Sequence, residues 1–198
     1  MDVNLPDFGP GVALVVVDMQ NDFADPSGSL FVAGGDALVD PVNRLTATAR
    51  SAGATVVLTQ DWHPSATPHF VTDGGPWPVH CVAGTWGAEL VAGLATDADA
   101  VVRKGTRGED GYSAFSMRDT RTGADVPTGL AGLLRERGIE QVVVVGLAAD
   151  VCVAATAHDA AASGFATTVA WHATRAVHPE TEPQVRADLA AAGVAVVG

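Results

Sequence analysis

The sequence predicts an α/β fold in which a mostly parallel, six-stranded sheet carries helices on both faces. Short apolar runs rich in valine alternate along the chain with longer segments rich in alanine and leucine. The short runs are apolar almost throughout, which is typical of strands that are buried on both faces of a parallel sheet. Since parallel strands need a crossover, usually a helix, the alternation favours a Rossmann-like, three-layer α/β/α arrangement.

The first half of the chain contains three predicted strands and one long predicted helix. Residues 12–18 (VALVVVD) and 55–59 (TVVLT) form the first two strands, and residues 100–103 form the third. Residues 36–53 are predicted to form the helix, because apolar residues recur there every three or four positions. These residues are Leu38, Val42, Leu45 and Ala49. Gly53 is expected to end the helix.

The second half repeats the alternation, and each predicted helix there is followed by a glycine and then by an apolar strand. The predicted helices are residues 128–137, 149–163 and 180–192, and the strands are residues 141–146, 166–171 and 194–197. No repeat, low-complexity tract or linker divides the sequence. We therefore expect a single domain over residues 1–198.

Two segments break this rhythm. Residues 61–86 are rich in proline, histidine, tryptophan and glycine, and residues 105–126 are polar and rich in glycine. Each follows a predicted strand, and sites in open α/β sheets lie beyond the carboxyl ends of the strands. We expect these two irregular segments to carry the chemistry.

Composition restricts the class of protein. A net charge of -12 and a pI near 4.6 argue against nucleic acid or anionic membranes as partners. No apolar run approaches the ~18 residues of a membrane-spanning helix, and the first ten residues, MDVNLPDFGP, lack the pattern of a signal peptide. The two cysteines, Cys81 and Cys152, permit one disulfide on their number alone but not a disulfide-stapled secreted scaffold. We expect a soluble protein of the reducing cytoplasm.

Three reactive side chains follow separate predicted strands. Asp18 ends the first strand, Lys104 follows the third, and Cys152 comes shortly after the strand that ends at Gly146. Parallel strands place all three at one edge of the sheet, so they can converge. Lys104 is also the only lysine among eleven basic residues, which reflects either chance or codon bias, or a site that needs an amine.

The chemistry of this trio is coherent. A thiolate is a nucleophile, and a helix N-terminus and a nearby cation lower the pKa of a thiol, so we expect a lowered pKa for Cys152, with Asp150 as the N-cap. Asp18 can accept the thiol proton and pass it to a leaving amine. Each residue also has a plainer interpretation: a small buried thiol, a turn-capping aspartate and a surface lysine.

A second group of side chains has the composition of a metal site. It consists of Asp61, His63, His69 and His80. Asp61 and His63 are two residues apart, so in extended backbone they share a face and can bind one ion. Imidazole and carboxylate ligands suit zinc, iron or manganese. The alternative is a loop whose polar residues cap turns. Cys81 is either a further ligand or a packed thiol, and Trp77 is either core or a stacking wall for a flat substrate.

Five motifs together resemble those of the nicotinamidase/pyrazinamidase group in the isochorismatase-like cysteine hydrolase superfamily. They span nearly the whole chain: VVDMQNDF (16–23), DWHP (61–64), WPVHCVAGTWGAEL (77–90), RKG (103–105) and GLAADVCV (146–153). The Asp, Lys and Cys trio marks the superfamily, and the metal-type cluster narrows the resemblance to nicotinamidases. The loops after Phe23 and Lys104 are slightly longer than the commonest pattern.

The resemblance implies a role for each matching residue. Cys152 would be the nucleophile, Asp18 the general acid/base and Lys104 the cation that stabilises the thiolate. One divalent metal ion (zinc, iron or manganese) would be held by residues of the second group: Asp61, His63 and His80, with His69 as the further histidine that some members use.

The resemblance also implies how a substrate is held. A cis peptide would join Leu147 to Ala148 and direct the N–H groups of Ala148 and Cys152 toward the developing oxyanion. Three aromatic residues would form the walls around the substrate ring: Phe23, Trp77 and Tyr112.

These matches predict hydrolysis of nicotinamide to nicotinate and ammonia, and of pyrazinamide to pyrazinoate, through a cysteine thioester, as a step of NAD salvage. The partner is then a small-molecule substrate, and family members occur both as monomers and as homo-oligomers. One alternative is another amidohydrolase of the superfamily, acting on a carbamoyl or maleamate-type amide; such relatives usually lack Asp61, His63 and His80. A second is a catalytically silent metal-binding module, against which the complete trio of Asp18, Lys104 and Cys152 argues.

Overall fold

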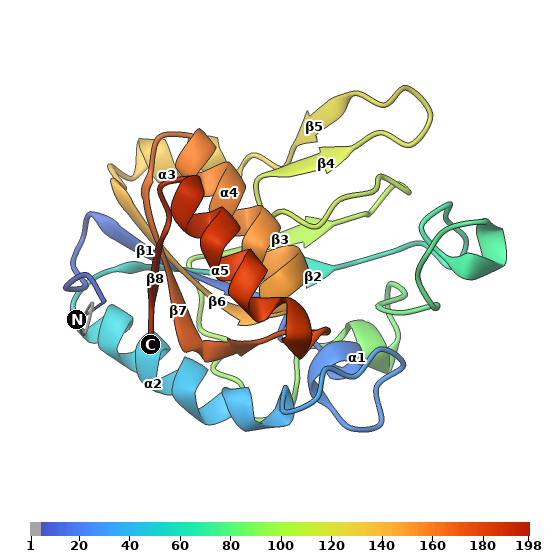
Figure 1. The fold of residues 1–198 in the computed structure, drawn as a ribbon, viewed down its shortest axis with the longest axis horizontal. Coiled ribbons are helices and arrows are strands. Elements are labelled where there is room, and N and C mark those ends of the chain that lie inside the picture. The colour runs from blue at the N-terminus through green and yellow to red at the C-terminus, as the bar shows by residue number, and fades with distance from the viewer. Residues whose placement is uncertain (1–4) are drawn as a thin grey trace.

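A computed structural model describes residues 5–198 of the chain and has the predicted three layers (Figure 1). Residues 1–4, the start of the segment considered above as a possible leader, lie outside this described part. Within residues 5–198 one parallel sheet has six strands in the order β3-β2-β1-β6-β7-β8. They are β1 (Val12–Val17), β2 (Thr55–Asp61), β3 (Ala100–Lys104), β6 (Gln141–Leu147), β7 (Ala166–Arg175) and β8 (Ala195–Val197).

Helices cover both faces of this sheet. They are α1 (Asn21–Ala24), α2 (Val39–Ser51), α3 (Leu130–Glu136), α4 (Ala154–Ala162) and α5 (Glu182–Ala191). Helix α2 packs on one face, against β1 and β2, while α3, α4 and α5 pack on the other (Figure 1). Each face has its own buried cluster, because the strand side chains alternate between the two faces: Leu14 lies with Val42 of α2, and Val15 lies with Leu134 of α3.

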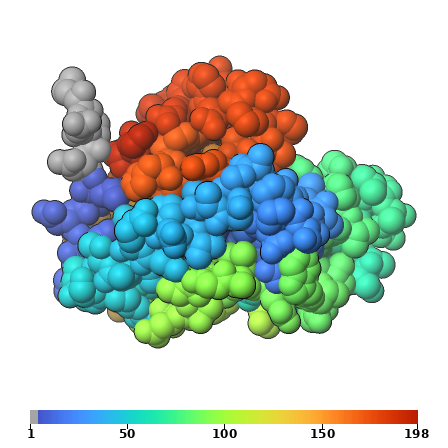
Figure 2. Space-filling model, turned by 90° about the horizontal axis from the view of Figure 1, so that it is seen from below, coloured from blue at the N-terminus to red at the C-terminus, as the bar shows by residue number. Residues whose placement is uncertain are grey.

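Short helical turns complete the connections. They are η1 (Asp36–Leu38), η2 (Val71–Asp73), η3 (Trp86–Ala88), the π-turn η4 (Ala149–Val153) and η5 (Pro179–Thr181). The segment between η3 and β3 runs beside α2 on the face shown in Figure 2, where Asn43 donates to the carbonyl of Gly93 at 2.8 Å and accepts from the N–H of Ala95 at 2.7 Å. Among residues 5–198, no helix combines the length and the apolar character needed to cross a bilayer.

The strand order places the predicted reactive residues at one edge. β1 lies between β2 and β6, so the chain runs outward in both directions from the β1–β6 pair, and a cleft forms beyond the carboxyl ends of such neighbouring strands. The register pairs Asp61 with Lys104 and Val17 with Gly146. Asp18 and the turn that carries Cys152 therefore follow directly from neighbouring strand ends.

Two local predictions were wrong. Residues 105–126 are not irregular throughout, since β4 (Ser116–Arg118) and β5 (Asp125–Pro127) form an antiparallel hairpin; strands of three residues are too short to show an alternating pattern. The helix expected to begin at residue 149 opens with the π-turn η4 and becomes α-helical only at Ala154. π-turns of this kind occur often at functional sites.

Candidate active site

Lys104 lies at the centre of the strand-end cluster. Its Nζ is 2.7 Å from Asp18 Oδ2 and 3.0 Å from Asp61 Oδ1, and it donates a further hydrogen bond to the carbonyl of Tyr112 at 2.8 Å. Lys104 and Asp18 are both fully buried. Burial opposes the charge on Lys104, but the two carboxylates outweigh it and raise the pKa of the amine well above its usual range. Lys104 is therefore a permanent cation, and the plainer interpretation as a surface lysine is wrong.

Asp18 is held in one orientation. Thr59 Oγ1 donates to Asp18 Oδ1 at 2.5 Å and accepts from the Asp18 N–H at 3.1 Å. Burial raises the pKa of Asp18 above the usual value for an aspartate, against the opposing effect of Lys104. A carboxylate with a raised pKa is a stronger base, which suits proton transfer.

Cys152 meets the same carboxylates. Its Sγ and one oxygen each of Asp18 and Asp61 all lie within 4.8 Å of one another. The expected lowering of the thiol pKa is wrong: burial, together with the two carboxylates, raises the pKa of Cys152 well above its usual range, although Lys104 acts in the opposite sense. The resting residue is thus a thiol, and its proton has to move when it attacks.

Asp150 does not cap the turn that carries Cys152, because its carboxylate is engaged elsewhere. It accepts the N–H groups of Val177 and His178 at 2.8 and 2.9 Å, which ties the turn to the segment after β7. The residue at the N-cap is Ala148, and no side chain caps it. The peptide bond between Leu147 and Ala148 is cis, which confirms that prediction.

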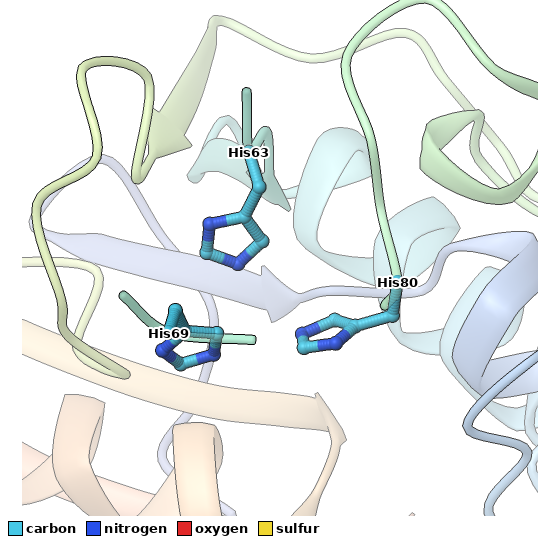
Figure 3. A group of neighbouring side chains, drawn as sticks. All are labelled: His63, His69 and His80. Atoms are coloured by element: carbon cyan, nitrogen blue, oxygen red, sulfur yellow. The ribbon is translucent and has the colours of Figure 1, made fainter. Parts of the chain in front are cut away.

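Three histidine rings converge beside this cluster (Figure 3). Nitrogens of His63, His69 and His80 lie within 4.8 Å of one another, and all three residues are buried. The carboxylate of Asp61 faces the group, with its Oδ2 3.8 Å from His63 Nε2 and 3.9 Å from His80 Nε2. Burial lowers the pKa of His69 and of His80, so both rings are neutral near pH 7 and each offers a lone pair.

The chemistry of this group fits a metal ion. Neither ring nitrogen of His63 has a hydrogen-bond partner within the described part of the chain, although the residue is 1% exposed. Leaving a buried imidazole without partners is costly in a metal-free core. His80 has Nδ1 2.6 Å from the carbonyl of Pro78, which leaves Nε2 free to bind. Gly105 makes room for His63, since a Cβ there would lie 2.5 Å from His63 Nδ1.

Asp61 belongs to both groups at once, which the sequence did not reveal. One oxygen faces Lys104 and the other faces the histidines. The register of β2 and β3 produces this arrangement, because it pairs Asp61 with Lys104 at the strand ends. The two predicted clusters are therefore one continuous site.

Aromatic residues line the cavity above the thiol. The cavity is bounded by Phe23, Trp77 and Tyr112 together with Cys152, Ala148 and Leu147. Trp77 Nε1 donates to Tyr112 Oη at 2.9 Å, so these two walls support each other. Trp77 thus lines the cavity, and its role as a stacking wall for a flat substrate stays a prediction.

Three polar residues that support the site had no predicted role. The Gln20 side chain forms two hydrogen bonds with the backbone of Asp61: it donates to the carbonyl at 2.7 Å and accepts from the N–H at 2.8 Å. Asp22 accepts the N–H of Cys81, next to His80, at 2.7 Å. Asp110 lies 2.6 Å from His69 Nδ1. Gln20 and Asp22 lie within the VVDMQNDF motif, which is the one signal that points to them; Asp110 has none.

Comparison with known proteins agrees with this geometry. The sequence profile of the isochorismatase domain matches residues 12–198. The chain belongs to the isochorismatase family. A nicotinamidase of Acinetobacter baylyi is 42% identical over 183 residues, covering 83% of this chain and 81% of that protein.

Solved structures of the family share the fold. PnC1 from L. infantum in complex with nicotinate superposes with a TM-score of 0.88 at 44% identity, covering 97% of this chain and 95% of that one. The pyrazinamidase of Pyrococcus horikoshii in complex with zinc superposes with a TM-score of 0.84 at 37% identity, covering 95% and 99% of the two chains. The predicted isochorismatase-like α/β fold is confirmed.

Proposed function

We propose that this enzyme is a nicotinamidase that hydrolyses nicotinamide to nicotinate and ammonia, and that also accepts pyrazinamide. The observation that carries the proposal is the junction at Asp61, where a buried thiol, acid and amine meet a cluster of three histidines under an aromatic cavity. The relatives named above, which include a nicotinamidase and a protein bound to nicotinate, support the same substrate. Ammonia and nicotinate as products fit a step of NAD salvage.

Cys152 performs the nucleophilic attack in this proposal. The thiol is protonated at rest, so its proton passes to Asp18 as Sγ bonds to the carboxamide carbon. The N–H groups of Ala148 and Cys152 stabilise the negative charge that develops on the amide oxygen. Lys104 offsets the charge that accumulates on the thiolate and on the carboxylates beside it.

Asp18 then returns its proton to the leaving nitrogen. The C–N bond breaks, ammonia departs, and the acyl group remains on Cys152 as a thioester. A water molecule attacks the thioester while Asp18 takes one of its protons. The C–S bond breaks, nicotinate leaves, and the thiol regains its proton, so that one amide and one water are consumed in each cycle.

A divalent metal ion is part of the proposal, and Asp61, His63, His69 and His80 would hold it. When bound, such an ion supplies a positive centre that orients the ring nitrogen of the substrate, directly or through water. The walls formed by Phe23 and Trp77 keep the flat ring in place. Zinc in the P. horikoshii pyrazinamidase supports an ion of this class, with iron and manganese compatible with the same ligands. A free nucleophilic thiol also favours the reducing cytoplasm as its location.

Trapping the thioester tests the covalent step, and the chain offers a matched control. Cys152 and Cys81 are the only two cysteines, and both are free and buried. We expect protein quenched in acid during turnover to gain the mass of one nicotinoyl group. Cys152→Ala should lose this adduct and all measurable turnover. Cys81→Ala should keep both, because within residues 5–198 the Cys81 thiol forms no hydrogen bond other than a 3.8 Å contact with the Gly87 carbonyl and does not line the cavity. Turnover by Cys152→Ala would overturn the proposal.

A further inference from the structure

His69 is held differently from the other two histidines. His63 is the second residue after β2, and the ring of His80 is fixed by the carbonyl of Pro78. His69 lies in the long connection between β2 and β3, two residues before the helical turn η2, and it belongs to none of the strands within residues 5–198. Its ring therefore depends on side-chain partners for its orientation.

Asp110 provides the polar partner of that ring. Asp110 Oδ1 lies 2.6 Å from His69 Nδ1, and no other hydrogen bond to the His69 ring exists in the described part of the chain. A proton on Nδ1 donates to the carboxylate and leaves the lone pair on Nε2, the nitrogen on the opposite side of the ring. Carboxylates that accept the second N–H of a histidine ligand fix its tautomer and raise its basicity.

The backbone of Asp110 is fixed independently of its side chain. Its N–H donates to the carbonyl of Arg118 at 2.8 Å and its carbonyl accepts the N–H of Arg118, so it pairs with the last residue of β4. The β4–β5 hairpin thus carries Asp110 to the His69 loop. Because these contacts use only the backbone, a change of side chain at residue 110 leaves the anchor of the segment in place.

We propose that Asp110 is a positioning residue of the metal site, which acts through His69 by holding its ring with Nε2 toward a divalent cation. The inference rests on the proposed metal site and adds to it a residue outside the ligand set. Its consequence is that the hairpin, which is not part of the six-stranded sheet, contributes to metal affinity. The carboxylate is 41% exposed, so solvent weakens its effect compared with a buried partner.

The test is zinc affinity, measured by competition with a chromophoric chelator on the full chain after its metal has been removed. Asp110→Ala should raise the Kd for zinc about tenfold or more, the usual consequence of removing the partner of a histidine ligand. Asp110→Asn keeps an acceptor oxygen without the charge and should show a smaller loss. Glu109→Gln removes the same charge from the adjacent residue, whose carboxylate accepts the Arg107 N–H instead of contacting a histidine, and should leave the Kd unchanged.

A double-mutant cycle shows whether Asp110 acts through His69. In a His69→Ala background, adding Asp110→Ala should change the Kd by less than about twofold, because the partner is already absent. A merely structural effect of residue 110 would persist in that background.

Two results would overturn the inference while leaving the proposed function intact. One is that Asp110→Ala binds zinc as tightly as the wild type. The other is that Asp110→Ala weakens zinc binding by the same factor in the wild-type and His69→Ala backgrounds. Failure of the wild-type protein to bind zinc, iron or manganese would instead remove the metal site itself, and this inference with it. Binding by the wild type together with the predicted losses would support both.

Discussion

Replacing Lys104 by methionine leaves two buried carboxylates without the cation they share. Methionine keeps most of the length and volume of the lysine stem, so the change removes charge and hydrogen bonds more than packing. Asp18 and Asp61 lie 2.7 and 3.0 Å from the amine, and all three side chains are at most 5% exposed. The variant therefore isolates the electrostatic role of Lys104 in the fold.

The magnitude follows from these distances. At an effective dielectric constant of about 20, each contact has a gross Coulomb energy of about 6 kcal/mol. Desolvation of the ions offsets much of it, and removing one partner of a buried ion pair costs about 3–5 kcal/mol of the free energy of unfolding. We expect a loss of this size at pH 8, measured by urea denaturation of the metal-free protein.

The loss should also depend on pH, with a definite sign. Lys104 holds the pKa of Asp61 well below its usual range, so the stabilisation is present above the unfolded-state pKa of an aspartate and lost in acid. Without the amine, burial meets less opposition, so the pKa values of Asp18 and Asp61 rise in the folded variant, although Thr59 still acts to lower the first and His63 the second. Their protonation as the pH falls relieves the charge, so the deficit at pH 5 should be smaller than at pH 8.

A neighbouring arginine provides the control. Arg103→Met also removes a cation, but one that is exposed and lies over the Trp62 ring at 3.8 Å, so it should cost no more than about 1 kcal/mol at either pH. A Lys104→Met deficit equal to that of the control, or one that does not change between pH 8 and pH 5, would refute the electrostatic reasoning.

Two further predictions concern the scaffold. Gln20→Leu leaves the buried N–H and carbonyl of Asp61 without the Gln20 side chain as a partner, and should lower the free energy of unfolding by about 2–4 kcal/mol in urea denaturation. A loss below about 0.5 kcal/mol would contradict a stabilising role for these two hydrogen bonds. Burial opposes the charge of Asp99, but the Val56 N–H and Arg50 outweigh it and lower the pKa of Asp99, so its stabilisation exists above the unfolded-state pKa and disappears as the pH falls through the folded-state value. Asp99→Asn should therefore lower the free energy of unfolding by about 1 kcal/mol at pH 7, and by less at pH 3, in the same assay. The control is Asp97→Asn, which should have little effect at either pH because the Asp97 side chain is 96% exposed. Equal effects of the two substitutions would show that the contacts of Asp99 do not stabilise the fold.

The sequence predicts the sheet well because its strands are buried on both faces. Runs such as VALVVV and VVVVG contain no polar side chain, and each lies within a strand of the structure. The parallel arrangement also predicts that Asp18, Lys104 and Cys152 lie close together, because the carboxyl ends of parallel strands share one edge of the sheet. Strand ends are less well defined by composition, and β7 continues four residues beyond its predicted end at Trp171.

What the sequence does not show depends on contacts between distant segments. The raised pKa of Cys152 results from its burial beside Asp18 and Asp61, and no local sequence pattern predicts burial next to these two residues. Asp150 has the composition of an N-cap, yet the N–H groups that it accepts lie 27 and 28 residues further along the chain. Asp110 reaches His69 only because a hairpin of two three-residue strands holds it there.

Ammonia release from nicotinamide tests the central proposal most directly. It is measured with the purified, reduced protein before chelation, after chelation, and after zinc is restored. The junction of thiol, acid, amine and histidines at Asp61 predicts release that disappears on chelation and returns with zinc. No release from the zinc-loaded, reduced protein would contradict the assignment and direct attention to carbamoyl and maleamate-type amides.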